Sequence, residues 1–331
     1  GEPTGLLFEM DGYLDGLMPR LSQKELSFGI KAFNELCLRS GITSVQDATH
    51  LNSLERWDIF SSLKDGNFLD PRLNFMVSVD HVDDFVDQGL GFFEGDKDLR
   101  VGAAKLMVTM TTGQMWPTKD MIRHLLDNAY SKNFQVAIHA VESEIVGEIT
   151  RILGSYGLKG FGYRNRIEHC SECPESLTRQ LAKNGVNVVT QPGFIYHSGE
   201  KYLREVPIDF QQWVYNIGSL MRSGVSVAFS SDSPVIPLDP MIGIYSAVNR
   251  LTKAGNEFHT EESISVIDSL KAYTLGGAYA SFEEKEKGSI EVGKLADVIL
   301  LDRNPIIVDP LDLKNIEVSM TIIGGNVVWD K

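Results

Sequence analysis

The sequence lacks any apolar run of about 18 residues, which argues against a transmembrane helix. It also has no short repeat and no low-complexity tract, so solenoids and flexible linkers are excluded. Cysteine is scarce: Cys37, Cys170 and Cys173 are too few for a disulfide framework, and we therefore predict a cytoplasmic protein. Positively charged residues are few: the chain has 31 Lys and Arg and 45 Asp and Glu, which gives a net charge of −14. This balance predicts no binding to nucleic acid or to an anionic membrane.

The 331 residues are 43% hydrophobic and 23% charged, which is typical of a globular protein with one large domain and a smaller one. Apolar, β-rich runs recur about every 30 residues, the length of one βαβ unit. Since these runs are continuous rather than alternating, they predict parallel strands that are covered on both faces. The predicted strands cover residues 43–46, 73–79, 101–108, 134–140, 166–170, 186–191 and 225–230.

Helical segments fill the gaps between these strands. In residues 22–40 the apolar positions recur at helical intervals, Ser22 and Glu25 can form a capping box, and Gly41 follows as a stop. Similar patterns predict helices over 118–133, 174–185 and 209–223. Strands that alternate with helices indicate an α/β fold, and the number of units favours a (β/α)8 barrel.

A closed barrel of this type needs eight strands, and the patterns predict seven. Either one strand is missed, or the first lies upstream of Gly1. The last part of the chain has short β runs at 288–292, 296–301 and 318–329, a Gly324-Gly325 turn and no long helix. We therefore predict a barrel domain over 1–285, incomplete at its N-terminus, and a small C-terminal β segment over 286–331.

Polar residues at the C-terminal ends of barrel strands are the first candidates for catalysis. His139, His169 and Asp232 each end such a run, and Lys105 lies inside one, where burying it unpaired would be costly. Two imidazoles and a carboxylate at one barrel mouth suit a divalent metal of the zinc class. Each residue also has a plain interpretation, as a hydrogen-bonded histidine, a turn-opening aspartate or a lysine paired with a carboxylate.

These candidates lie in segments that, taken in order, resemble the metal-dependent amidohydrolase superfamily. The segments are VGAAKLMV, QVAIHAVE, RIEHCSECPE, VVTQPGF, VAFSSDSPV and GSIEVGKLADVILLDRNP. The chain is most similar to the amidohydrolase family 3 branch, which contains the N-substituted formamide deformylases. The resemblance implies a TIM-like metallo-dependent hydrolase barrel and a C-terminal part of a small composite β-sandwich. It also implies hydrolysis of a non-peptide carbon–nitrogen bond in a small-molecule substrate, an amide or a cyclic amide.

Carried over residue by residue, the resemblance implies that His139 and His169 are metal ligands. Asp232 would be both a ligand and the proton shuttle. Lys105 would match a lysine that is carbamylated in many members and bridges two metals. The implied cofactor is a divalent metal, zinc by preference, with one or two ions in a complete enzyme.

The chain departs from the superfamily pattern in several places. The first-strand His-x-His is absent, since neither His50 nor His81 has a histidine two residues away. Residues 1–9 resemble the end of a long insertion that follows that strand, so we expect the chain to be the C-terminal portion of a longer enzyme. Residues 109–110 and 142–144 replace runs that are usual near the substrate pocket. For this reason a deformylase substrate is not carried over.

These departures shape what we expect of the site. The four side chains of Lys105, His139, His169 and Asp232 should converge at the barrel mouth. At most one ion should bind to this chain, on the His139–His169 side. Its affinity should rise with pH through the histidine range, because neutral imidazole is the ligand.

Other features have more than one interpretation. Tyr196 and His197 could contact substrate from a loop at the barrel mouth, and a plain loop is an equal alternative. Cys170 and Cys173 have the spacing of half of a zinc site. Because the sequence has no second pair of cysteines, we interpret them as structural. A homo-oligomer is possible. The alternative function is a metal-depleted fragment, or a binding protein on the same scaffold.

The missing strand leads to a test at the level of the gene. We predict that the reading frame upstream of Gly1 encodes a His-x-His strand, preceded by a β segment. Sequencing of the native coding region provides the measurement. A native start at Gly1, or a stop codon directly before it, would contradict this prediction.

Overall fold

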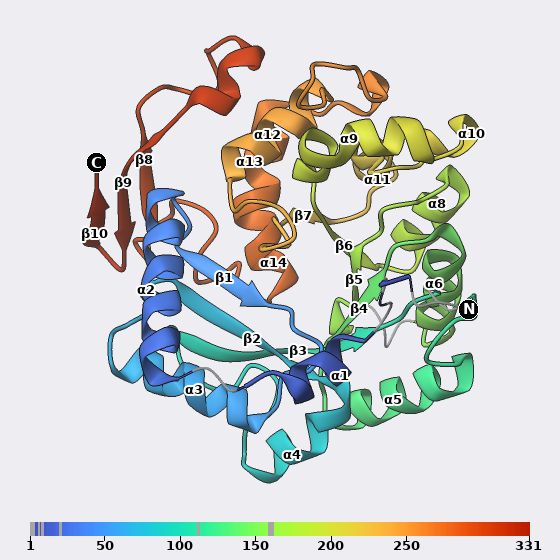
Figure 1. Ribbon diagram of the computed structural model, residues 1–331, viewed down its shortest axis with the longest axis vertical. Coiled ribbons are helices and arrows are strands. Elements are labelled where there is room, and N and C mark those ends of the chain that lie inside the picture. Colours follow the sequence, from blue (N-terminus) through green and yellow to red (C-terminus); the bar gives the residue numbers. More distant parts are fainter. Residues whose placement is uncertain (1–3, 6, 8–9, 20–21, 111–112, 158–161) are drawn as a thin grey trace.

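The computed structural model describes residues 4–5, 7, 10–19, 22–110, 113–157 and 162–331. Within these ranges the main element is a seven-stranded parallel sheet, in which the strands follow one another in chain order (Figure 1). Its strands are β1 (Ser44–Asp47), β2 (Arg72–Ser78), β3 (Leu99–Met107), β4 (Val136–Ala140), β5 (Arg166–His169), β6 (Asn187–Thr190) and β7 (Val227–Phe229).

All seven predicted strands are confirmed, and so is the parallel α/β organisation. Among the described residues, β1 pairs only with β2 and β7 pairs only with β6. The sheet is therefore an open barrel, which confirms the expected incomplete (β/α)8 fold. The carboxyl ends of all seven strands lie at one edge, where side chains from different strands can meet.

Helices connect the strands and cover the sheet. The α-helices are α1 (Asp11–Leu17), α2 (Gln23–Arg39), α3 (Leu54–Asp65), α4 (Val82–Asp87), α5 (Lys119–Ser131), α6 (Ser143–Ser155), α8 (Glu175–Lys183), α9 (Gly193–Glu205), α10 (Ile208–Gln211), α11 (Ile217–Arg222), α12 (Pro240–Asn249), α13 (Val266–Lys271) and α14 (Gly277–Ala280). Shorter turns are η1 (Val79–His81), η2 (Thr260–Glu262), the π-helical η3 (Ala272–Gly276) and η4 (Pro310–Asn315). None of the helices in the described part of the chain is long and apolar enough to cross a membrane.

The predicted start of α2 is confirmed in detail. Ser22 Oγ accepts a hydrogen bond from the Glu25 N–H at 3.3 Å, and Glu25 Oε2 accepts one from the Ser22 N–H at 2.8 Å. This reciprocal pair is a capping box, and it satisfies two amide groups that the first helical turn leaves open. After the helix, Gly41 adopts the left-handed φ of +72° that favours glycine.

Two predicted elements are wrong. The segment 209–223 is not one helix, because α10 and α11 are separated by residues 212–216. There the Tyr215 N–H donates to the Ser171 carbonyl at 2.8 Å, and Tyr215 has a left-handed φ of +48°, so the chain leaves the helical path. Residues 288–292 form no strand in the structure, where Ile290 and Val292 are exposed and a turn at Gly293 follows.

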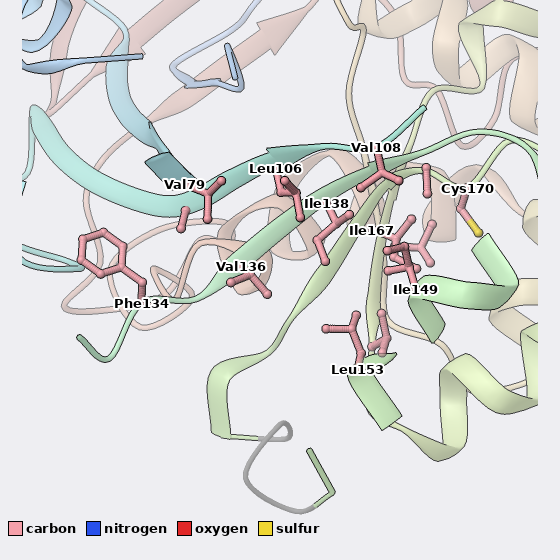
Figure 2. Close-up of a cluster of buried hydrophobic side chains, with 14 of the residues drawn as sticks. Val79, Leu106, Val108, Phe134, Val136, Ile138, Ile149, Leu153, Ile167 and Cys170 are labelled. Atoms are coloured by element: carbon pink, nitrogen blue, oxygen red, sulfur yellow. The ribbon is translucent and has the colours of Figure 1, made fainter. Parts of the chain in front are cut away.

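The outer face of the sheet is apolar and packs against helices. Figure 2 shows Val136 and Ile138 of β4 and Ile167 of β5 beside Ile149 and Leu153 of α6, and all five side chains are buried. Full burial of such side chains stabilises the fold by about 1.5–3 kcal/mol each. The outer face is therefore where the core holds the sheet in place.

The inner face of the sheet carries the polar side chains. Ala103 of β3 and Ala137 of β4 form a small inner cluster that is separate from the main core. Successive side chains in a strand alternate between faces, so Lys105 and His139, each two residues further on, lie on the same inner face. The alternation thus places both candidate residues inside the barrel.

A helical segment lies at the open side of the barrel, between β7 and β1. Gly276 of η3 sits so close to β7 that an added Cβ would lie 2.7 Å from the Val227 carbonyl oxygen. On the other side, Gln46 Nε2 of β1 donates to the Gly277 carbonyl at 3.3 Å. Glycine at position 276 therefore allows η3 to approach β7, and the hydrogen bond from Gln46 joins α14 to β1.

The C-terminal β segment is confirmed as a three-stranded antiparallel sheet, made of β8 (Val298–Leu301), β9 (Val318–Ile323) and β10 (Asn326–Asp330). It lies beside α2 (Figure 1), and Thr321 Oγ1 donates to the Leu38 carbonyl at 2.6 Å. A boundary between domains after residue 285 stays a prediction.

An ion pair joins this C-terminal segment to the barrel. Arg72 of β2 donates from Nε to Asp297 Oδ2 at 2.7 Å and from Nη2 to Asp297 Oδ1 at 2.9 Å, and both side chains are buried. Arg72 also faces Asp98 at 2.6 Å. Burial alone would raise the pKa of Asp297, but the hydrogen bonds from Arg72 and the Gly324 N–H outweigh burial and lower it.

We expect Asp297→Asn to lower the free energy of unfolding by about 3 kcal/mol at neutral pH, the low end for a broken buried pair, because Asp98 still faces Arg72. A lowered carboxylate pKa stabilises the fold above the unfolded value of about 3.9 and loses that effect as pH falls through the folded value. Urea unfolding at neutral pH and near pH 3 measures both effects. Asp330→Asn, on the exposed end of β10, is the control, and equal stability of the two variants at neutral pH would contradict the prediction.

Candidate active site

Two histidines meet at the carboxyl edge of the sheet. His139 comes from β4 and His169 ends β5, and their ring centroids are 4.5 Å apart in an edge-to-face arrangement. The strand register brings them together, since Ala140 pairs with His169 and His139 pairs with Glu168. The expected meeting of these two imidazoles is therefore found in the structure.

The backbone at His169 explains how its ring reaches His139. Ile167 packs in the outer core while Glu168 lies inside, so simple alternation would turn His169 outward. His169 instead has a left-handed φ of +74°, which interrupts the alternation. Asp232, after β7, also has a left-handed φ, +60°. Such backbone is destabilising by about 1–3 kcal/mol at a non-glycine residue and gathers at functional sites.

A hydrogen-bond chain orients the His169 ring. Gln191, which follows β6, donates from Nε2 to the Ser230 hydroxyl at 2.9 Å and to the Val189 carbonyl at 3.4 Å. Its Oε1 lies 2.9 Å from His169 Nδ1 and must be the acceptor there. His169 Nδ1 therefore carries the proton, and Nε2 keeps the lone pair that can bind a metal.

Lys105 lies in a buried network of charges on the inner face. Arg166 donates from Nε to Glu168 Oε1 at 2.5 Å, and Arg166 Nη1 donates to Gln46 Oε1 at 2.6 Å. Burial lowers the pKa of Lys105, while Glu168 and Asp232 oppose that shift. For Glu168, burial alone would raise the pKa, but Arg166 and Lys105 lower it.

A cavity of about 260 Å³ opens at this edge of the sheet. His139, His169 and Asp232 all line it, and Lys105 does not. The remaining lining residues are Val141, Ser171, Glu172, Phe194, Tyr202, Val206, Val214 and Tyr215. A second cavity, of about 350 Å³, lies beside β6, β7 and α13 and contains none of the four candidate residues.

The donor chemistry of the first cavity suits a divalent metal. Burial, with His169, Lys105 and His50 nearby, lowers the pKa of His139 to about 2, and burial also lowers that of His169. Both pKa values lie below the ordinary histidine value of about 6.5, which favours the neutral imidazole that binds a metal. The expected rise of metal affinity with pH through the histidine range stays a prediction.

Two imidazoles alone form an incomplete ligand set. Within the described ranges, no three His, Cys, Asp or Glu side chains are placed to hold one ion together. Asp232 lines the same cavity as the two histidines, and burial raises its pKa while His169 and Lys105 oppose the shift. The residues that could hold a metal are therefore His139 and His169, with Asp232 as the nearest carboxylate in the cavity.

The structure places other predicted residues elsewhere. Tyr196 and His197 lie on α9 rather than on a loop, and Tyr196 packs against Tyr245 of α12 with 5.8 Å between ring centroids. Neither lines the cavity, so their contact with substrate stays a prediction without support from the cavity's lining. Cys170 and Cys173 are buried free thiols that contact each other, and in the described part of the chain they belong to no metal cluster.

Several residues of the site were missed from the sequence. Gln191 had a signal, because it directly follows the strand ending at Thr190, at the catalytic edge of the barrel. Arg166 and Glu168 alternate with Ile167, a charged pattern that indicates an inward-facing pair. Glu172 had no comparable signal.

The chain is similar to known proteins of one enzyme family. A family model described as "Amidohydrolase family" matches residues 1–329. YtcJ of Bacillus subtilis (strain 168) is 25% identical over 353 residues, which cover 100% of this chain and 66% of that protein. An N-substituted formamide deformylase from Arthrobacter pascens is 28% identical over 175 residues, covering 50% of this chain and 31% of that enzyme.

Solved structures show the same fold. An uncharacterized metal-dependent hydrolase from Pyrococcus horikoshii OT3 superposes with a TM-score of 0.76 and 25% identity, covering 88% of this chain and 62% of that one. The chain therefore spans less than two thirds of the length of each of these three proteins.

The orienting role of Gln191 leads to a prediction about metal affinity. Gln191→Leu removes the acceptor from His169 Nδ1 and should weaken zinc binding by about 10–100-fold, the usual effect of losing such a partner. Gln191→Glu keeps an acceptor at that position and should retain most of the affinity. Calorimetric titration with zinc, together with thermal unfolding of each variant, provides the measurement. Equal affinities for the leucine and glutamate variants would show that Gln191 does not orient the ring.

Proposed function

This chain belongs to the amidohydrolase family, and from that premise we propose that it is a metal-dependent hydrolase of a non-peptide carbon–nitrogen bond. The substrate class is a small amide or a cyclic amide. One observation carries the proposal: His139, His169 and Asp232, from the ends of three different strands, line one cavity at the catalytic edge of the barrel.

The donor atoms favour zinc among divalent metals, because imidazole nitrogen with a carboxylate oxygen is a common zinc environment. His139 and His169 would hold the ion, with His169 oriented by Gln191. A metal bound there would polarise the scissile carbonyl and lower the pKa of a nearby water. The name of the Arthrobacter pascens relative, an N-substituted formamide deformylase, is consistent with this reaction class.

Asp232 is the residue of this chain that would move the proton. Its pKa is raised by burial, which makes the carboxylate a better proton acceptor than an exposed aspartate. It would accept the proton of the attacking water and donate it to the departing nitrogen. Lys105 opposes this rise in the pKa of Asp232.

Lys105 has two possible states in this proposal. Its lowered pKa increases the share of neutral amine, which can add carbon dioxide to give a carbamate and release a proton. Glu168 opposes this, because a carbamate would place a second negative charge near its carboxylate. Carbamylation therefore stays a prediction, as do a cytoplasmic location, a homo-oligomer and the absence of nucleic acid or membrane partners.

The experiment measures amine release from a panel of small amides and cyclic amides, with and without added zinc. Asp232→Asn should lower kcat by about 10²–10⁴-fold, the usual contribution of a general acid–base residue. Asp120→Asn is the control, since Asp120 is fully exposed on the outer helix α5, and its activity should equal that of the unmodified protein. An unchanged rate of hydrolysis in Asp232→Asn, or an unchanged rate after a chelator removes the metal, would contradict the proposal.

The same experiment addresses the alternative function. A chain that binds small amides but hydrolyses none of them, even with zinc bound, would be a binding protein on this scaffold. Zinc content measured beside turnover separates that outcome from a simple lack of metal.

A further inference from the structure

Aromatic side chains form one wall of the catalytic cavity. Phe194 and Tyr202 come from α9, and Tyr215 comes from the segment between α10 and α11. The Phe194 and Tyr215 rings are stacked, with 5.7 Å between centroids and 8° between planes, and Tyr202 lies 6.0 Å from Tyr215. Such a wall suits a flat or apolar substituent, because stacked and edge-to-face contacts add to the effect of burial.

The backbone that carries this wall is held firmly. Ser171 accepts a hydrogen bond from the Tyr215 N–H at 2.8 Å, and Glu172 is bridged to Val214. Behind the wall, the fully buried Arg250 donates from Nη1 to the Tyr215 carbonyl at 2.7 Å and from Nη2 to the Val214 carbonyl at 3.4 Å. The cavity is therefore built before any ligand arrives, which favours selective binding.

Glu172 is the carboxylate that this framework presents to the cavity. In the described part of the chain the Glu172 carboxylate accepts only one hydrogen bond, a long one of 3.4 Å from the Ser143 N–H to Oε2. No described Lys or Arg forms an ion pair with it. Burial raises the pKa of Glu172, and the neighbouring Glu142 and Glu144 add to the rise.

Six other carboxylates of low exposure in the described part of the chain form an ion pair with Lys or Arg. The pairs are Arg72–Asp297, Arg166–Glu168, Lys119–Glu148, Arg164–Glu284, Arg222–Glu262 and Lys287–Glu283. Glu172 differs from them in lining the catalytic cavity instead of a packed interface. Among the described residues, the cavity therefore contains a Glu172 carboxylate that no Lys or Arg neutralises through an ion pair.

We infer that this cavity selects amides whose nitrogen substituent is a flat apolar group ending in a positive charge, and that Glu172 is the residue that recognises the charge. The aromatic wall holds the flat group through stacked and edge-to-face contacts. A charge-assisted hydrogen bond to Glu172 then fixes the orientation. The inference rests on the proposed function for the bond that is cleaved, whereas the binding preference can be measured without any cleavage.

The test uses two ligands of nearly equal shape, N-(4-aminomethylbenzyl)formamide, which is cationic, and N-(4-ethylbenzyl)formamide, which is neutral. Calorimetry on the chelator-treated chain at low salt measures both affinities without turnover. The unmodified chain should bind the cationic ligand at least tenfold more tightly. Glu172→Gln should bring the ratio of the two affinities close to one. Glu175→Gln, on the exposed surface of α8, should keep the tenfold ratio.

Two further variants separate the effect of the aromatic wall from the effect of the Glu172 charge. Phe194→Ala should weaken both ligands by a similar factor, since it removes the wall and not the charge. Glu172→Lys should reverse the preference, so that N-(4-carboxybenzyl)formamide binds better than the cationic ligand. A cationic preference that survives in Glu172→Gln, or no preference in the unmodified chain, would overturn the inference.

Hydrolysis measured afterwards with zinc separates the two proposals. Cationic preference without hydrolysis of these formamides or of any amide in the panel would leave the inference standing and contradict the proposed function. Hydrolysis of both formamides at equal efficiency, without a binding preference, would support the proposed function and overturn the inference.

Discussion

Arg166 and Glu168 form an ion pair inside the curved sheet, and both side chains are almost wholly buried. Such a pair adds little stability compared with apolar residues of the same volume, because desolvation offsets the attraction. Its importance lies in what it positions. Arg166 reaches Gln46 on β1 and the Ala280 carbonyl of α14, while Glu168 directs its charge toward Lys105. One ion pair thus joins the open side of the barrel to the lysine of the site.

The outer face of the sheet stabilises the fold, and the inner face carries the candidate catalytic residues. Packing of the apolar outer face against helices supplies the stability that lets strained backbone persist at the strand ends. His169, Cys170 and Asp232 all have left-handed φ values. Cys170 connects the core with the strained strand end. Its side chain belongs to the main core, and its N–H donates a hydrogen bond to the Ala140 carbonyl. The core therefore holds His169 in the conformation that brings it to His139.

Buried carboxylates also differ between the packed interfaces and the cavity. The chain is strongly acidic, yet its buried carboxylates away from the cavity are neutralised by arginine or lysine and serve to join elements. At the cavity the pattern changes, since Asp232 and Glu172 have no such partner among the described residues. Carboxylates without a cation in a preformed, partly aromatic cavity are what a substrate or a metal can use.

The amino-acid sequence by itself determined the seven strands, their parallel order, the capped start of α2 and the positions of His139, His169 and Asp232 at strand ends. These features depend on local periodicity, on capping residues and on the direction of parallel strands, which are all visible along the chain. Tertiary structure alone decided that Gln191 orients His169, that Phe194 and Tyr202 rather than Tyr196 and His197 line the cavity, and that residues 212–216 interrupt a helix. Each of these depends on left-handed backbone or on contacts between residues far apart in the chain. A local pattern can place Gln191 after a strand, but it does not show which residue Gln191 contacts.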